Sequence, residues 1–241
     1  MGAHLSEPIT LKDSEHGENE NLRFGATSMQ GWRKEQEDAH IVELDLPDGC
    51  SVFGVFDGHG GKIVSIYVKR VFVNELKRLQ TFKQKQYEAA LKEVMYRMDE
   101  MMLSTSGQEA LKKIALEVST DITQAGDDNN VALRVGCTAV VVLVTPTHIY
   151  CANSGDSRSV LARSAENESV TAVALSEDHK PDNELEQKRI EAAGGSVSES
   201  RVNGNLALSR ALGDFEYKLN KSKSYKEQMV TCLPDITKNE R

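Results

Sequence analysis

The chain lacks the patterns that mark several common protein classes. Its four cysteines, Cys50, Cys137, Cys151 and Cys232, show no paired spacing and form no Cys-x-x-Cys motif. A zinc site is therefore not expected, and a reducing compartment is favoured. No apolar run approaches the length of a membrane span, and no signal-peptide pattern occurs. The net charge of −8 argues against a generic nucleic-acid binder, because that class carries a basic face.

The first residues do match one targeting pattern. Met1-Gly2-Ala3-His4-Leu5-Ser6 fits M-G-x-x-x-[ST], the N-myristoylation signature, with Gly2 as the acceptor. The alternative is an ordinary frayed terminus. A single myristoyl chain gives only marginal, reversible membrane binding. The sequence therefore predicts a cytoplasmic protein with, at most, weak membrane association.

The hydrophobic patterning predicts an α+β fold. Residues 1–21 read as a polar lead-in without periodicity, and the lysine-rich stretch 218–241 shows no terminal strand. Strands are expected over 22–29, 41–46, 51–56, 138–145, 148–152, 158–162 and 170–175, and a hairpin over 196–208 with a tight turn at Asn203-Gly204. Helices are expected over 61–79, 84–103, 109–123 and 183–193. Strands and helices grouped in blocks favour α+β over a doubly wound parallel sheet.

Two short blocks near the start carry most of the chemistry. The first is Arg33-Lys34-Glu35-Gln36-Glu37-Asp38, and the second is Asp57-Gly58-His59-Gly60-Gly61 at the end of a strand-like run. Carboxylate oxygens suit hard cations such as Mg²⁺ and Mn²⁺, and arginine is the side chain best matched to phosphate. The blocks together indicate metal-assisted attack on a phosphate. Each piece alone has an ordinary alternative. The run 57–61 can be only a turn, the pair Glu37-Asp38 can be solvated, and His59 can be a capping or core histidine.

Further motifs occur in a fixed order along the chain. They lie at residues 31–33, 37–40, 55–61, 136–139, 152–158, 177–181, 193–195 and 201–214. In these motifs the chain resembles the metal-dependent serine/threonine protein phosphatases of type 2C, the PPM family. The resemblance runs from about residue 22 to residue 218.

The resemblance implies a four-layer fold. Two antiparallel β-sheets form a sandwich that is flanked on both sides by antiparallel α-helices, with the metal site at one end. Residues 22–241 would form this catalytic domain, with a flap-like segment around residues 180–230.

The resemblance also implies a metal site. Asp57 would bridge two Mn²⁺ or Mg²⁺ ions, and the carbonyl of Gly58 and the side chain of Glu37 would complete the protein ligands of one ion. Asp38 would hydrogen-bond to metal-bound waters. Asp156 would help to bind a third, weaker ion, although it has an alternative reading as a turn cap.

Four other residues receive roles from the family. Arg33 would hold the substrate phosphate, and His59 would act as general acid toward the leaving alkoxide. Thr138 and Arg201 would line or support the site. The alternatives are a structural Arg33–Glu37 ion pair, simple packing for Thr138 and a strand-end charge for Arg201.

The implied reaction is hydrolysis of phosphoserine or phosphothreonine in phosphoprotein substrates by a metal-bridging hydroxide. No phosphoenzyme is needed, and the chain lacks the C-x5-R motif of cysteine phosphatases. The alternative function is a catalytically silent relative that acts as a binding module.

The chain departs from the family after Asp214. Relatives carry two later aspartates that bind the other metal ion, and no residue after Asp214 matches those motifs. We therefore expect a chain that is incomplete at its C-terminus and lacks strands from the middle of the sandwich. Exposed sheet edges would favour self-association.

Overall fold

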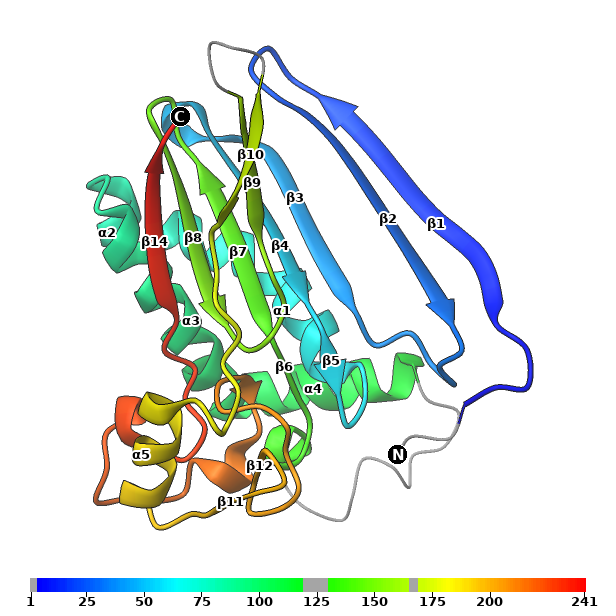
Figure 1. Ribbon diagram of the computed structural model, residues 1–241, viewed down its shortest axis with the longest axis vertical. Coiled ribbons are helices and arrows are strands. Elements are labelled where there is room, and N and C mark those ends of the chain that lie inside the picture. The colour runs from blue at the N-terminus through cyan, green and yellow to red at the C-terminus, as the bar shows by residue number, and fades with distance from the viewer. Residues whose placement is uncertain (1–3, 119–129, 165–168) are drawn as a thin grey trace.

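The computed structural model describes residues 4–118, 130–164 and 169–241. Its centre is an antiparallel five-stranded sheet in the order β14-β8-β7-β4-β3 (Figure 1). These strands are β3 (Ala39–Leu46), β4 (Cys50–Phe56), β7 (Ala139–Val144), β8 (His148–Ser154) and β14 (Asp235–Glu240). The central strand β7 consists only of alanine, valine and leucine, as expected for a strand covered on both faces.

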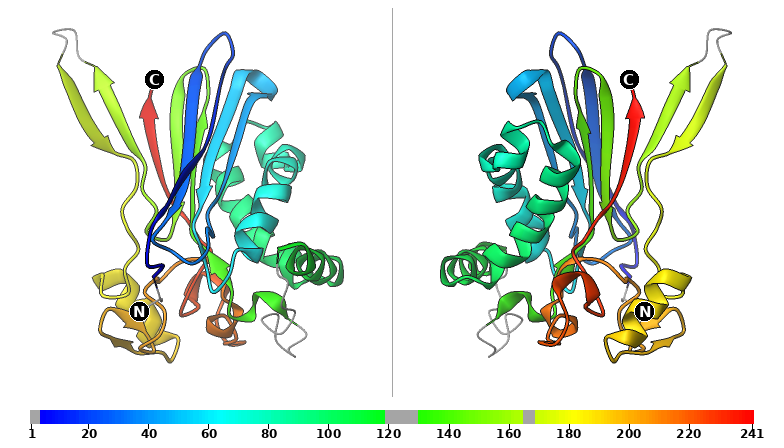
Figure 2. Two further views of the ribbon diagram at one scale, coloured as in Figure 1. Left: turned by 90° about the vertical axis from the view of Figure 1, so that its right-hand side faces the viewer. Right: turned by 90° about the vertical axis from the view of Figure 1, so that its left-hand side faces the viewer.

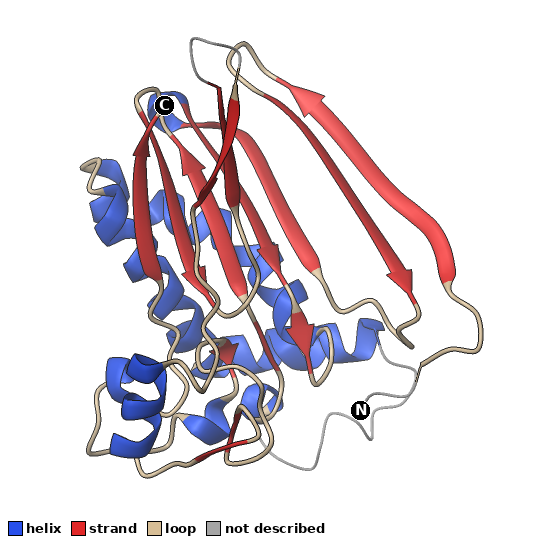
Figure 3. Ribbon diagram, viewed as in Figure 1, coloured by secondary structure: helices blue, strands red, loops and turns tan. Residues whose placement is uncertain are grey.

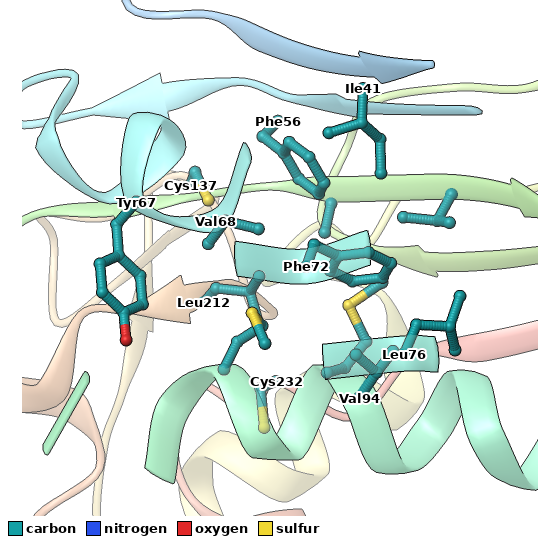
Figure 4. Packing of buried hydrophobic residues seen from close by; sticks show 14 of the residues in the cluster. Ile41, Phe56, Tyr67, Val68, Phe72, Leu76, Val94, Cys137, Leu212 and Cys232 are labelled. Carbon is teal, nitrogen blue, oxygen red and sulfur yellow. The ribbon is translucent and has the colours of Figure 1, made fainter. Parts of the chain in front are cut away.

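Helices cover one face of this sheet (Figure 2). They are α1 (Ile63–Arg78), α2 (Gln80–Lys83), α3 (Tyr87–Leu103) and α4 (Thr105–Val118). Val64, Val68, Phe72 and Leu76 recur every four residues along α1 and are fully buried. Phe72 packs against Phe56 of β4 with ring centroids 5.7 Å apart (Figure 4). This interface is the main hydrophobic core.

Two hairpins lie toward the other face of the sheet (Figures 1 and 2). One pairs β1 (Ile9–Glu18) with β2 (Arg23–Gly31), and the other pairs β9 (Val160–Ser164) with β10 (Val170–Ala174). Leu161 and Leu175 pack with Val140 and Cys151 of the sheet and form a small second core. Helices therefore pack on one side of the sheet, and the two hairpins lie toward the other side (Figure 2).

A small sheet and a compact segment lie at one end of the molecule (Figure 3). The three-stranded sheet has the order β13-β6-β5, with β5 (Gly58–His59), β6 (Gly136–Cys137) and β13 (Leu212–Gly213). The segment holds α5 (Glu184–Ala192), β11 (Val197–Ser198) and β12 (Arg201–Val202). Short 3-10 turns occur at Pro47–Gly49, Val131–Leu133, Phe215–Tyr217 and Tyr225–Glu227.

The expected α+β class is confirmed, and three local predictions are wrong. The segment expected to be a polar lead-in contains β1, which pairs along β2. Residues 218–241 do contain a terminal strand, since β14 pairs with β8 at the edge of the main sheet. The strand expected over 196–202 is interrupted by a turn at Glu199 and Ser200, both with positive φ, and a second turn follows at Asn203-Gly204 as predicted.

Two predictions reach beyond the described residues. Gly2 lies outside them, and so does the end of the helix expected over 109–123. Among the residues that the structure does describe, no helix is long and apolar enough to cross a membrane.

Candidate functional site

A polar cleft of about 430 Å³ opens beside β5 and the end of β2. The segment between β2 and β3, together with β5 and the residues after β6 and β8, forms its walls. The cleft is lined by the predicted site residues Arg33, Glu37, Asp38, Asp57, Gly58, His59, Thr138 and Asp156. The structure therefore brings together eight predicted residues that are up to 123 positions apart (156 − 33).

Glu37 reaches the cleft because Gly58 carries no side chain. A β-carbon on Gly58 would lie 2.5 Å from the carbonyl oxygen of Glu37, closer than real contacts allow. The hydroxyl of Ser65 at the start of α1 donates a hydrogen bond of 2.6 Å to the same oxygen. The Glu37 segment is thus held against β5 beside Asp57.

Asp57 is fixed through its main chain by Thr138. The Asp57 N–H donates to Thr138 Oγ1 at 3.1 Å, and the Thr138 N–H donates to the Asp57 carbonyl at 2.9 Å. Thr138 Oγ1 also lies 2.6 Å from Ser157 Oγ, and Thr138 is only 1% exposed. Thr138 therefore holds the main chain of Asp57 at the wall of the cleft.

The carboxylates in the cleft repel one another. Partial burial, the charge of Asp38 and a hydrogen bond with the Asp38 side chain raise the pKa of Asp57 to about 6, and Asp156 adds to the effect. Burial and the nearby charge of Glu35 raise the pKa of Glu37. Crowded acidic oxygens of this kind are stabilised by a bound cation.

The chemistry of this donor set fits a hard divalent cation. Asp57, Glu37 and the Gly58 carbonyl all offer oxygen, which suits Mg²⁺ or Mn²⁺ rather than zinc. Within the described ranges, no three acidic, histidine or cysteine side chains already stand in ligand geometry. Asp57, Glu37 and Gly58 line one cleft, so they are the residues that would hold such an ion.

Arg33 stands at the rim of the cleft with its guanidinium available. Gln30 holds the chain there by donating from Nε2 to the carbonyls of Arg33 and Lys34, both at 2.9 Å. The alternative ion pair with Glu37 is absent: in the part of the chain that the structure describes, Arg33 forms no ion pair within 4.0 Å. An exposed, unpaired guanidinium beside carboxylates suits phosphate binding.

His59 forms a close pair with Asp214. The distance from His59 Nε2 to Asp214 Oδ2 is 2.6 Å, and the Asp214 side chain is 3% exposed. Burial alone would lower the pKa of His59, but the Asp214 hydrogen bond and the charges of Asp214, Asp57 and Glu37 outweigh it and raise the pKa. The pair lies over Gly136, where a β-carbon would be 2.4 Å from Asp214 Oδ2.

Asp156 and Arg201 occupy different positions from those of the central carboxylates. The Asp156 carboxylate accepts a hydrogen bond from the Lys180 ammonium, so it is not simply a turn cap. Arg201 is exposed and donates to the Asn205 carbonyl at 2.7 Å. It lines a neighbouring pocket that shares His59 with the main cleft.

Sequence reasoning gave no role to two residues of the site. Asp214 and Lys180 each lie inside a quoted motif, but nothing in the local pattern shows that Asp214 pairs with a histidine 155 positions earlier. A Gly-Asp dipeptide after a short apolar run was the only signal. The pairing depends on β13 lying next to β6, which is a tertiary contact.

Comparisons with known proteins agree on one family. The family model described as protein phosphatase 2C matches residues 22–241. The chain is 47% identical over 240 residues to probable protein phosphatase 2C 4 of Paramecium tetraurelia, covering 100% of this chain and 74% of that protein. It is 40% identical over 260 residues to probable protein phosphatase 2C 21 of Arabidopsis thaliana, covering 98% of this chain and 72% of that protein.

Solved structures show the same fold at lower identity. A crystal structure of a phosphatase from a pathogenic strain of Toxoplasma gondii matches with a TM-score of 0.65 at 23% identity, covering 98% of this chain and 74% of that chain. A serine-threonine phosphatase 2C from Toxoplasma gondii matches with a TM-score of 0.59 at 21% identity, covering 99% and 77%.

Proposed function

The chain belongs to the protein phosphatase 2C family, and we propose that it hydrolyses phosphoserine and phosphothreonine in proteins with the help of Mn²⁺ or Mg²⁺. That it is a phosphatase, and so a hydrolase acting on phosphoproteins, follows from the family. One observation supports the proposed metal-dependent hydrolysis of phosphoserine and phosphothreonine: an unpaired arginine, a histidine and a set of acidic oxygens share a single cleft.

The proposed roles are those that the family resemblance implies, and the shared cleft of these residues supports them. Asp57 would be a ligand of two cations, Glu37 and the carbonyl of Gly58 would complete the protein ligands of one of them, and Asp156 would contribute to a third, weaker site. When bound, these cations would supply an activated water and offset the charge of the phosphate. Asp38 lies against Asp57 and would orient the attacking water through hydrogen bonds.

The substrate phosphate would bind to Arg33. Its guanidinium can donate two parallel hydrogen bonds to phosphate oxygens. The alkoxide of serine or threonine leaves poorly, so a proton from His59 would lower the barrier as the bond to phosphorus breaks. All four cysteines are buried and none lines the cleft, so attack by a thiolate of this chain is not part of the proposal.

Localisation is a separate proposal that rests on the N-terminal pattern. We expect a cytoplasmic protein whose Gly2 is N-myristoylated, with weak, reversible membrane association. Mass spectrometry of the N-terminal peptide after co-expression with an N-myristoyltransferase tests it. An unmodified Gly2 would contradict it.

The proposed function is tested by hydrolysis of a phosphothreonine peptide with Mn²⁺ and with EDTA. We expect turnover that requires Mn²⁺ and that falls at least about 100-fold in Asp57→Asn, which removes a charge at nearly constant volume. The matched control is Asp13→Asn, an exposed carboxylate on β1 that should change nothing.

Other outcomes would identify a different function. Turnover that EDTA leaves unchanged would contradict the metal-dependent mechanism. Absence of turnover with Mn²⁺ bound would favour the binding-module alternative, in which the cleft holds a phosphorylated partner without cleaving it.

A further inference from the structure

A buried ion pair lies beneath the small sheet, away from the cleft. Asp99 of α3 and Lys218 are joined by a 2.6 Å contact between Oδ2 and Nζ, and 9% of each side chain is exposed. The neighbouring thiol of Cys232 also interacts with Asp99. Neither charged residue lines the cleft. The proposed chemistry therefore gives this pair no direct part.

Both charged groups also hold the main chain that leads to Asp214. The N–H of Gly213 donates to Asp99 Oδ1 at 2.9 Å, and Lys218 Nζ donates to the Ala211 carbonyl at 2.8 Å. Ala211, Leu212 and Gly213 are buried, with Leu212 in the main core (Figure 4). The ion pair thus clamps the three residues that precede Asp214.

The main chain at Asp214 leaves little freedom for its side chain. Asp214 has a φ of 50°, in the left-handed region, and its N–H donates to the Val135 carbonyl at 3.1 Å. Its carboxylate meets His59 Nε2 at 2.6 Å above Gly136. A small shift of Gly213 would therefore move the carboxylate away from the imidazole.

We propose that Asp99 and Lys218 are positioning residues for His59, acting through the main chain of β13 and the carboxylate of Asp214. The part of this inference that is tested by hydrolysis rates rests on the proposed function. Buried ion pairs add little net stability compared with apolar groups of similar volume. Its net contribution to stability therefore does not account for this pair, whereas holding β13 in place does.

The kinetic test compares two substrates in Asp99→Asn and Lys218→Met. A phosphothreonine peptide needs proton donation to its leaving group, whereas 4-nitrophenyl phosphate needs little. We expect kcat to fall at least about 10-fold for the peptide and less than about 3-fold for the aryl ester. A loss of folded protein alone would lower both rates equally.

Glu75→Gln is the matched control. Glu75 on α1 is 7% exposed and pairs with Arg97 of α3 at 3.0 Å, so it is another buried carboxylate in an ion pair that involves α3. Within the described residues, its hydrogen bonds and ion pairs go to Arg97 and Arg78 and not to β13. We expect this variant to lose stability and to keep the ratio of the two rates.

A second readout does not depend on turnover. The ¹⁵N chemical shifts of the His59 ring report its hydrogen bond to Asp214, and we expect them to change in Asp99→Asn and to stay unchanged in Glu75→Gln. If single variants fail to fold, Asp99→Leu combined with Lys218→Met removes both charges together and leaves no unpaired charge.

The outcomes separate this inference from the proposed function. Equal loss on both substrates with unchanged His59 shifts, in folded variants, would overturn the positioning role. If the parent protein hydrolyses neither substrate, the proposed function fails, and the His59 shifts alone decide whether the ion pair positions the histidine.

Discussion

The α-carbon of Gly58 faces the carbonyl oxygen of Glu37 so closely that a β-carbon would lie 2.5 Å from that oxygen. The contact joins the two short blocks of the sequence, residues 33–38 and 57–61, which precede β3 and follow β4. It sets how near the Glu37 carboxylate can come to Asp57. The space left by one missing side chain therefore shapes the cleft.

Gly58→Ala should displace the Glu37 segment. We expect a loss of stability of about 1–3 kcal/mol from overpacking and a fall in metal-dependent turnover of at least about 10-fold. Gly25→Ala on β2 is the control, because no atom beyond the neighbouring residues of the chain lies within 4 Å of its added methyl group. Denaturant unfolding and assays at several Mn²⁺ concentrations would measure both effects. Full activity at low Mn²⁺ in Gly58→Ala would contradict this account.

Thr138→Val should disturb Asp57 without changing the volume of the side chain. The Asp57 N–H would lose its acceptor in a partly buried place, which costs up to about 1–3 kcal/mol. We expect lower stability together with lower kcat. Thr237→Val removes a hydrogen bond to the Leu175 carbonyl, and neither residue lines the cleft, so it should lower stability alone. Equal kcat in the two variants would show that Thr138 only packs.

Arg33→Lys should behave almost like Arg33→Ala at the phosphate. A lysine cannot donate the two parallel hydrogen bonds of a guanidinium, and a charge-assisted hydrogen bond contributes about 1.5–3 kcal/mol. We expect kcat/KM for the phosphopeptide to fall about 10- to 100-fold in both variants.

Inhibition by inorganic phosphate should weaken in parallel with that loss. The control is Arg23→Ala, whose side chain is 87% exposed on β2. Phosphate inhibition that stays unchanged in the Arg33 variants would place the phosphate elsewhere.

Acid should destabilise the segment around α5 through Glu186. Burial alone would raise the pKa of Glu186, but the hydrogen bond from Arg210 and the charges of Arg189 and Arg210 outweigh it and lower the pKa to about 2. Since the folded pKa lies below the ordinary 4.5, this stabilisation is present above pH 4.5 and is lost as the pH falls toward 2. It amounts to roughly 3 kcal/mol at most.

The measurement is the free energy of unfolding at pH 7 and at pH 3, for the parent and for Glu186→Gln. We expect the difference between the two proteins to shrink at pH 3. Glu184→Gln, with a side chain that is 81% exposed, should follow the parent at both values. A difference that does not depend on pH would show that Glu186 is already protonated at pH 7.

Local patterns were enough to predict most elements of the fold. The four-residue recurrence of Val64, Val68, Phe72 and Leu76 predicts α1, and the β-branched run predicts β7. Local patterns do not predict β1 and β14, because the residues of both strands are mostly polar. Those of β1 are almost all exposed, and those of β14 are exposed or half-buried. Those strands exist because they pair with β2 and β8, and pairing partners are not visible in a local window.

The candidate site divides in the same way. Arg33, Glu37, Asp57 and His59 were found because their motifs are short and contiguous. The Asp214 partner of His59 and the Asp99 contact to Gly213, 114 positions away, depend on how β13 packs on β6 and α3. Contacts of that range follow from the fold and not from spacing.

The long sequence separation within the His59–Asp214 pair has a consequence for synthesis of the protein. Asp214 is translated 155 residues after His59, and at roughly 5–20 residues per second the interval between them is about 8–30 s. During that time the nascent chain already contains residues 33–38 and 57–61 but lacks the partner of His59. The ribosome must therefore finish most of the described chain before the site can assemble.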